Sequence, residues 1–147
     1  MTRKTFEPEE IAIRFDDVSV STQQAVTPTG TTNVINGGGG ADLLFGSTES
    51  DTFLFDALTA FDGIDQIANF NATEGDALDI SDVLDGFVVG TSAIDDFLQF
   101  SNSGADTVVS IDANGSVGGA NFVAVAEILG LNDLNATALF NDGEIIV

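Results

Sequence analysis

The sequence predicts an all-β domain in which short strands are joined by glycine-rich turns. Two consecutive nonapeptides, residues 37–45 and 46–54, repeat with a period of nine and place Asp42 above Asp51. Each unit is a glycine-rich turn, one carboxylate and a three-residue strand whose middle side chain points inward. Farther along, apolar and polar residues alternate from residue 106 to 112, as in a half-buried strand.

The first 27 residues are interpreted as an extension or linker ahead of the repeats. Apolar residues alternate from residue 11 to 15, which predicts a strand with a bulge or break at residues 16–17. Residues 22–32 are polar and contain Pro28 and Gly30, so we expect a linker there.

Residues 28–56 form the repeat segment, with Asn33 at the carboxylate position one register before the first nonapeptide. Glycines leave carbonyl oxygens bare for a ligand, and an Asp at the end of the turn adds a carboxylate. Oxygen ligands of this kind select calcium. A flexible glycine-rich linker is the alternative, but a linker has no reason to repeat an Asp and an apolar residue in phase.

The pattern Gly-Gly-x-Gly-x-Asp-x-U-x, where U is a large apolar residue, resembles the repeat of the RTX (repeats-in-toxin) family of secreted proteins. The first nonapeptide matches at every defined position, whereas the second has Ser47 and Glu49 in place of glycine. The resemblance implies a short parallel β-roll with glycine-rich calcium-binding turns. It also implies that alternate turns share one side, which pairs Asn33 with Asp51 and leaves Asp42 facing the chain after residue 55.

This resemblance implies one to three calcium ions bound by the turns. Asp42 and Asp51 are the expected side-chain ligands. The remaining candidates are Asn33, Asp56, Asp62 and Asp65 as side chains, and Gly37, Gly39 and Gly46 as donors of main-chain carbonyl oxygens. Asp65 and Asp76 are candidates both for ligands and for turn-formers, and for Asp76, beside Gly75, the turn is the favoured interpretation.

Residues 57–147 are expected to be a C-terminal cap and export-target region. Residues 63–87 resemble the segment that follows RTX repeats in secreted proteases and adhesins, with Asn69 in place of an Asp. This implies that an apolar set closes the open end of the roll. Its members are Ile64, Ile67, Phe70, Leu78 and Ile80. Ser81 and Asp82 predict the N-cap of a one-turn helix that stops at Gly86.

The rest of the chain predicts further strands. We expect a helix or strand at residues 94–100, a hairpin turn at Asn114-Gly115, a buried strand at 122–129 and a final apolar strand. This half resembles the C-terminal target region of type I secretion substrates. The resemblance implies a mostly β, sandwich-like cap with one or two short helices. It also implies an export signal, read by an ABC exporter and its associated channel, at Glu144, Ile145, Ile146 and Val147.

The charge balance narrows the classes of partner. There are 24 acidic residues against three basic ones, all three of them within the first fourteen positions, while 44% of residues are hydrophobic. A compact fold must therefore crowd carboxylates, and two such charges about 4 Å apart repel by roughly 4 kcal/mol at an effective dielectric near 20. Divalent cations are the obvious counterions, and an acidic solubilising surface is the alternative. The balance argues against nucleic acids and anionic membranes.

Missing residue types argue against catalysis. The chain has no cysteine and no histidine, which removes His-Glu-x-x-His zinc sites and every triad with a histidine base. The pair Asp95-Asp96 is expected by chance in so acidic a chain, and no small-molecule substrate is evident.

The start lacks the apolar core of a signal peptide, and no window is long enough to span a bilayer. Seven phenylalanines are assigned to the core: Phe53, Phe55, Phe70, Phe87, Phe97, Phe100 and Phe122.

Together these features predict a non-enzymatic, calcium-binding C-terminal module of a type I secreted bacterial protein. We expect it to reach the medium or the bacterial surface and to fold there on calcium. Two alternatives stay open. One is a structural or adhesive end module of a large surface adhesin. The other is the non-catalytic tail of a secreted exoenzyme whose active site lies upstream.

Overall fold

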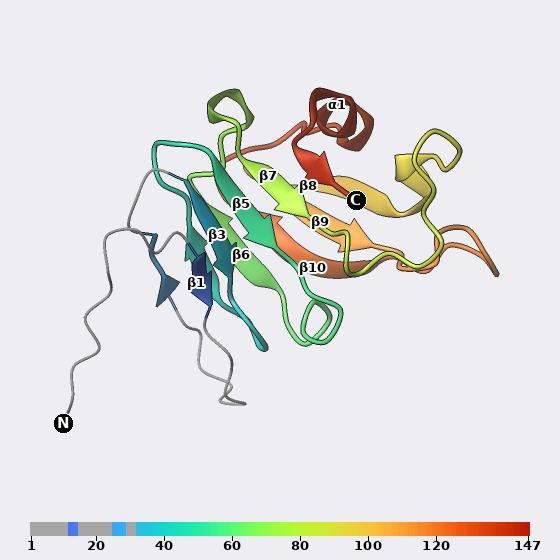
Figure 1. The fold of residues 1–147 in the computed structure, drawn as a ribbon, viewed down its shortest axis with the longest axis horizontal. Helices are drawn as coiled ribbons and strands as arrows, with labels where there is room; N and C mark the ends of the chain where they lie inside the picture. The colour runs from blue at the N-terminus through green and yellow to red at the C-terminus, as the bar shows by residue number, and fades with distance from the viewer. Residues whose placement is uncertain (1–11, 15–24, 29–31) are drawn as a thin grey trace.

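The computed structural model describes residues 12–14, 25–28 and 32–147, and these form two packed sheets (Figure 1). The break expected at residues 16–17 lies outside the described residues. No helix in the described part of the chain is long and apolar enough to cross a membrane.

The first sheet has five strands, and all neighbouring strands in it are parallel. In spatial order they are β1 (Ala12–Arg14), β3 (Asn33–Asn36), β5 (Asp51–Leu54), β7 (Ala77–Asp79) and β11 (Ile145–Ile146). From β2 to β7, consecutive strands alternate between this sheet and the second one. The repeat therefore builds both sheets at once, one strand per turn.

The second sheet has six strands. Its parallel part contains β2 (Ala25–Val26), β4 (Leu43–Phe45), β6 (Asp65–Ala68) and β10 (Val123–Ile128). Its antiparallel part adds β9 (Asp106–Ile111) and β8 (Leu98–Ser103) beyond β10. The strands predicted at 106–112 and 122–129 are thus confirmed within a residue or two.

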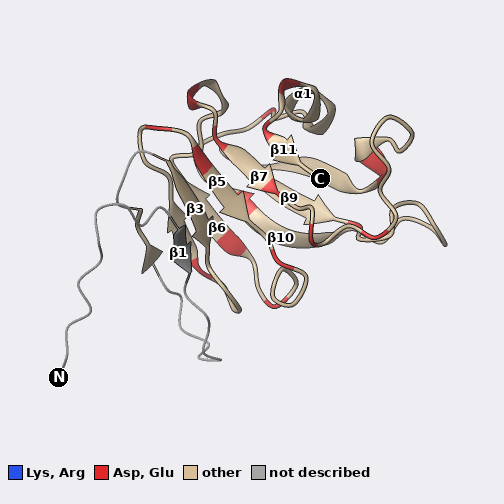
Figure 2. Ribbon diagram, viewed as in Figure 1, with Lys and Arg blue, Asp and Glu red and all other residues tan. Residues whose placement is uncertain are grey.

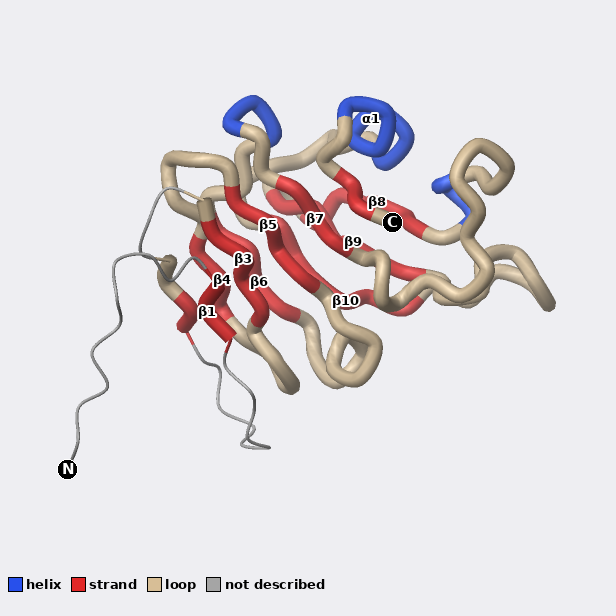
Figure 3. Tube along the Cα trace, viewed as in Figure 1, coloured by secondary structure: helices blue, strands red, loops and turns tan. Residues whose placement is uncertain are grey.

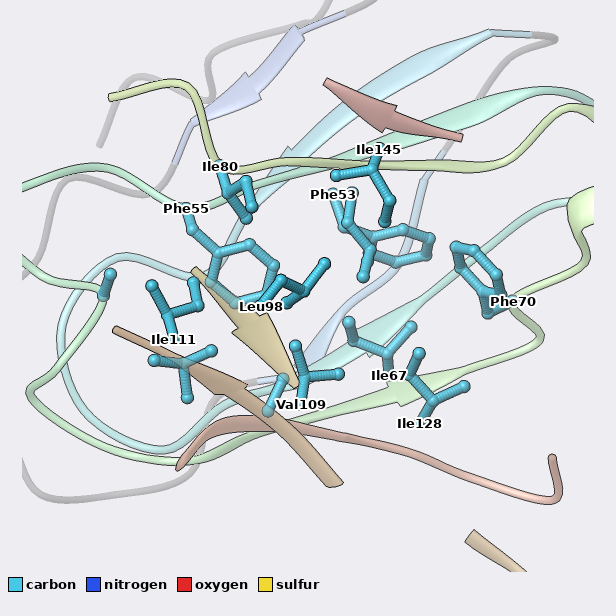
Figure 4. Packing of buried hydrophobic residues seen from close by; sticks show 14 of the residues in the cluster. Phe53, Phe55, Ile67, Phe70, Ile80, Leu98, Val109, Ile111, Ile128 and Ile145 are labelled. Atoms are coloured by element: carbon cyan, nitrogen blue, oxygen red, sulfur yellow. The ribbon is translucent and has the colours of Figure 1, made fainter. Parts of the chain in front are cut away.

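Apolar residues at the centre of each short strand fill the space between the sheets. Ile35, Leu44 and Phe53 come from three successive strands, and each is at most 1% exposed. Figure 4 shows residues of the later strands, among them Ile67 and Val109, packed into the same cluster. Because strand side chains alternate between faces, a period that places one apolar residue at each strand centre is sufficient to build this core.

Helical segments lie in the connections between strands (Figure 3). The 3-10 turns are η1 (Ala72–Glu74) and η2 (Ile94–Asp96), and the α-helix is α1 (Ala136–Asp142). Asn135 caps the start of α1 by accepting the Ala138 N–H, and Gly143 ends it with a positive φ of 97°. The helix then delivers β11 to the edge of the five-stranded sheet, beside β7.

The fold-class prediction was wrong. The six-stranded sheet mixes parallel and antiparallel pairs, and an α-helix precedes the last parallel strand. The arrangement is of an α/β type and is not an all-β roll followed by a sandwich-like cap. The physical reason is that β6 and β7 leave unpaired N–H and C=O groups at the sheet edges. The C-terminal strands β10 and β11 pair with those edges and so extend the same sheets.

Local predictions failed at four further places. Residues 25–26, expected in a linker, form β2. Residues 81–86 form turns without a helix, since Asp79 accepts the Ser81 N–H and hydroxyl at 3.1 and 2.6 Å. Asn114-Gly115 lies within a longer loop between β9 and β10 and does not form a tight hairpin. Ile64, expected to help close the apolar end of the roll, is 48% exposed.

Candidate metal centre

Each repeat carboxylate lies where a turn becomes a strand. Asp51 and Asp65 are the first residues of β5 and β6, and Asp42 directly precedes β4. All three are at most 9% exposed. The expected pairing is confirmed, because Asn33 and Asp51 are in register on β3 and β5. The period of nine therefore places polar groups of alternate turns next to one another.

The side chains of Asn33, Asp51 and Asp76 form a row along the five-stranded sheet. The Asn33 N–H and amide nitrogen donate to Asp51 Oδ1 at 3.1 and 2.6 Å, and the Asp51 N–H donates to Asp76 Oδ1 at 2.8 Å. Asp51 Oδ2 accepts a hydrogen bond from the Ser47 hydroxyl at 2.8 Å, and Asp76 Oδ2 accepts one from the Asn71 N–H at 2.9 Å. The carboxylates thus satisfy main-chain donors at the strand starts.

A second carboxylate pair lies on the six-stranded sheet. The Asp42 N–H donates to Asp65 Oδ1 at 2.9 Å, and both side chains are buried. Burial raises the pKa of Asp65 to about 7; the Asp42 N–H bond opposes this rise and the charge of Asp42 adds to it. Burial also raises the pKa of Asp76, against hydrogen bonds from Asn71 and Asp51. Both sheets therefore hold carboxylates that are costly to keep charged.

The glycine turn at residues 37–40 lies between two carboxylates. A Cβ at Gly37 would come within 2.8 Å of Asp42 Oδ2, and one at Gly39 within 3.4 Å of Asp62 Oδ2. Gly63 packs so closely on the turn that a Cβ added there would overlap the Gly40 carbonyl oxygen. The loop carrying Asp62 is therefore held against the turn.

Asp56 shapes that loop. Its Oδ1 accepts the N–H groups of Leu58 and Thr59 at 3.0 and 3.1 Å, and its Oδ2 accepts the Asn36 amide at 3.1 Å. Burial pushes the pKa of Asp56 up, but the hydrogen bonds from Asn36, Leu58 and Thr59 outweigh it and lower the pKa. Asp56 is thus engaged as a turn-former.

Gly46 contacts the main chain of the turn after β6. A Cβ there would lie 2.9 Å from the Asn69 carbonyl oxygen. Asn69 has a positive φ of 63°, a conformation that Asn adopts more readily than most residues, and its amide donates to the Gly46 carbonyl at 3.4 Å. Asn69 stands where the family-like pattern has an Asp, and its side chain tolerates the positive φ that the backbone adopts at this position.

The expected ligands do not gather in one place. Asn33 lies with Asp51, Asp42 lies with Asp65, and Asp56 and Asp62 lie on the loop after β5. Nowhere in the described residues do three acidic side chains converge as a metal-binding group. The sequence favoured a turn-forming role over a ligand role for Asp76, although Asp76 precedes Ala77-Leu78-Asp79 just as Asp42 precedes Leu43-Leu44-Phe45. That shared pattern was the signal for its place in the row.

The expected export signal is part of the folded domain. Ile145 is 3% exposed, and the Leu78 N–H donates to the Glu144 carbonyl at 2.8 Å. The Ile80 N–H donates likewise to Ile146 at 3.0 Å. The last residues therefore form the edge strand of the five-stranded sheet.

Figure 2 shows acidic positions along strand starts and turns across the whole described domain. The chain has no lysine or arginine after Arg14. No basic side chain from residue 15 onward therefore offsets the buried carboxylates.

Comparisons with family models, curated proteins and solved structures find no match to this chain.

Proposed function

We propose that this chain is a calcium-responsive module of an exported bacterial protein, and that calcium outside the cell stabilises its fold. The observation that carries the proposal is the closeness of buried acidic residues in a segment without any basic residue. The main-chain N–H groups of Asp42 and Asp51 donate to the carboxylates of Asp65 and Asp76, and, in addition to burial, the charges of Asp42 and Asp51 help to raise the pKa values of these two carboxylates. Like charges close to one another oppose folding when they are ionised. A divalent cation nearby offsets that repulsion.

The available donor atoms suit calcium. They are carboxylate, amide and main-chain carbonyl oxygens, and calcium takes 6–8 such ligands, with water often among them. Asp42 and Asp62 would hold the ion from the two sides of the glycine turn, together with main-chain carbonyl groups of Gly37 and Gly39. Asn33 Oδ1 is a further buried oxygen, with no hydrogen-bond partner among the described residues. Bound calcium would supply positive charge beside the carboxylates.

Calcium acts in this proposal by mass action. An ion that binds only the folded chain adds about 2.7 kcal/mol of stability at a hundred times its dissociation constant. Where calcium is scarce, the chain stays loose enough to be exported by an ABC exporter and its associated channel, which read the last residues. Where calcium is abundant, the folded state of the same chain is stabilised. The domain then belongs to a secreted or cell-surface protein.

Far-UV circular dichroism with thermal melting tests the proposal. The full chain is measured in chelator, in millimolar calcium and in millimolar magnesium. We expect calcium alone to raise the melting temperature by about 10 °C or more. Asp62→Asn should reduce this rise while preserving the fold, because Asp62 is exposed. Asp96→Asn, at an exposed position on η2, is the matched control. A melting temperature that calcium leaves unchanged contradicts the proposal.

The burial of Ile145 favours a second candidate, a structural end module of a surface protein in which β11 completes the sheet. Removing residues 144–147 separates the two. The structural module predicts lower stability and unchanged export of a fused reporter, whereas an export signal predicts loss of export.

A further inference from the structure

The loop between β5 and β6 exposes several large apolar side chains. Leu58, Phe61 and Ile64 are 89%, 41% and 48% exposed, which makes three of the eight such residues in the described chain. A single exposed apolar residue is ordinary on a protein surface, but three within one short loop are not. Apolar groups concentrated in this way mark a surface that binds something.

This exposure is built into a folded loop. Asp56 accepts the N–H groups of Leu58 and Thr59, and the Asp62 N–H donates to the Thr59 carbonyl at 3.0 Å. Ala60, at the centre of the loop, is 7% exposed and belongs to the core cluster. A loop that is already ordered loses little conformational entropy when a partner binds.

An acidic hollow adjoins the apolar loop. It is lined by Gly40, Ala41, Asp62, Gly63, Ile64, Gln66 and Glu127. Glu127 on β10 is in register with Gln66 on β6, so the hollow extends from the loop onto the six-stranded sheet. Ile64 provides an apolar wall, and Asp62 and Glu127 provide negative charge. No basic residue follows position 14, so residues 15–147 offer these two carboxylates no ion-pair partner.

We propose that residues 56–64 and this hollow form a docking surface for a partner polypeptide segment that is both basic and apolar. Its apolar side chains cover Leu58 and Phe61, and a lysine or arginine enters the hollow beside Glu127, which is not a proposed calcium ligand, with its aliphatic stem along Ile64. A second copy of this chain fits less well, because a net charge of −21 on each copy is repulsive. The inference goes beyond the proposed calcium response.

Titration with a short synthetic peptide tests this surface. The probe is a fluorescently labelled peptide of alternating leucine and lysine, followed by anisotropy with the full chain in calcium. Leu58→Ser with Phe61→Ser should weaken binding about tenfold, and Glu127→Gln about threefold. Val88→Ser with Val89→Ser, at two other exposed apolar positions, is the matched control and should leave the affinity unchanged.

Two control peptides separate specific docking from general attraction to an acidic protein. Peptides in which serine replaces leucine, or glutamine replaces lysine, should bind at least about tenfold more weakly than the probe. Equal binding of the serine–lysine peptide, or unchanged affinity in the Leu58→Ser Phe61→Ser variant, overturns the proposal. Self-association that disappears in Arg3→Gln Lys4→Gln overturns it in favour of a second copy.

The same samples keep this proposal distinct from the calcium response. Circular dichroism in calcium checks that each variant is folded. If the Leu58→Ser Phe61→Ser variant does not fold, Leu58→Ser alone replaces it in the titration, because Leu58 is the more exposed of the two side chains. Glu127 is not among the proposed calcium ligands, so Glu127→Gln should keep the calcium-dependent melting temperature. Peptide binding that persists when calcium has no effect on melting refutes the calcium response alone.

Discussion

The parallel strands β2–β7 and the strands β8–β10, which pair antiparallel with one another, pack on one core but are held together differently. Strand β10 joins the two regions, because it also pairs in parallel with β6. Parallel strands of two to four residues are joined by carboxylates that accept N–H groups from neighbouring strands, as Asp51, Asp65 and Asp76 do. The antiparallel strands are six residues long, and β8 and β9 pair along their whole length. Asp106 and Asp112, at the two ends of β9, also accept main-chain N–H groups. The carboxylates whose pKa is raised in part by a neighbouring carboxylate, Asp65 and Asp76, lie in the parallel region. Ionic conditions should therefore act mainly on the parallel region, whereas apolar burial should govern both.

The largest expected effect is the loss of a side chain from the core cluster to which both regions contribute. Phe53 is fully buried on β5 and lies 6.0 Å from the Phe70 ring, centroid to centroid. Phe53→Ala should cost about 4 kcal/mol of unfolding free energy. Hydrogen exchange should then report faster opening in parallel and antiparallel strands alike, with exposed Leu58→Ala as the control. Protection that survives in β8 and β9 would mean that the two regions unfold separately.

The next effect compares the two regions by making the same change, Asn to Asp, once in each region. Asn33 donates to buried Asp51 at 2.6 Å, and Asn102 donates to exposed Asp133 at 2.7 Å. In chelator, Asn33→Asp should cost about 3 kcal/mol, because it replaces a donor by a second buried charge. Asn102→Asp should cost under about 1 kcal/mol, because water screens the exposed pair. Urea unfolding measures both, and equal costs would remove the proposed difference between the regions.

Acid should stabilise the parallel region when calcium is absent. The pKa of Asp65 is raised to about 7 in the fold, above its unfolded value of about 4. The folded state therefore binds this proton more tightly, so stability rises as the pH falls through about 7 and levels off near 4. We expect a gain of about 2 kcal/mol between pH 8 and pH 5 in chelator. Calorimetry of Asp65→Asn, which should lose this dependence, is the check.

The smallest expected effect is confined to the C-terminal helix. Asn135 caps α1 by accepting the Ala138 N–H at 2.8 Å. Asn135→Ala should cost about 1 kcal/mol, and Asn135→Ser, which keeps a capping oxygen, should cost less. Hydrogen exchange should report faster opening of α1 and β11 while β3 and β5 keep their protection. Equal loss of protection in the parallel strands would mean that the helix supports the whole domain.

Much of the local structure followed from sequence pattern. The period of nine predicted the turns, the family resemblance implied the pairing of Asn33 with Asp51, and period-two alternation predicted β9. Glycine at position 37 is required because a Cβ would meet the Asp42 carboxylate at 2.8 Å. These features depend on residues close together in the chain or on a repeat, so a pattern can reveal them.

Other features depended on contacts between distant segments. The position of β10 beside β6, with Ala126 opposite Asp65, has no local signal. The exposure of Ile64 and the saturation of both Asp51 oxygens by hydrogen bonds were also not predictable from spacing. Helix α1 was missed as a specific element, although Asn135 and Gly143 are typical capping residues.

The sequence by itself determined a surplus of carboxylates, the glycine turns and a strand after each of them. Only the tertiary structure decided which carboxylates meet, which loop side chains stay in water and which strands complete each sheet. The physical reason is that turn geometry and alternation act over a few residues, whereas burial and strand pairing bring together segments far apart in the chain. Asp51 is an expected calcium ligand in the repeat pattern, whereas in the fold its carboxylate accepts hydrogen bonds from Asn33 on the neighbouring strand β3.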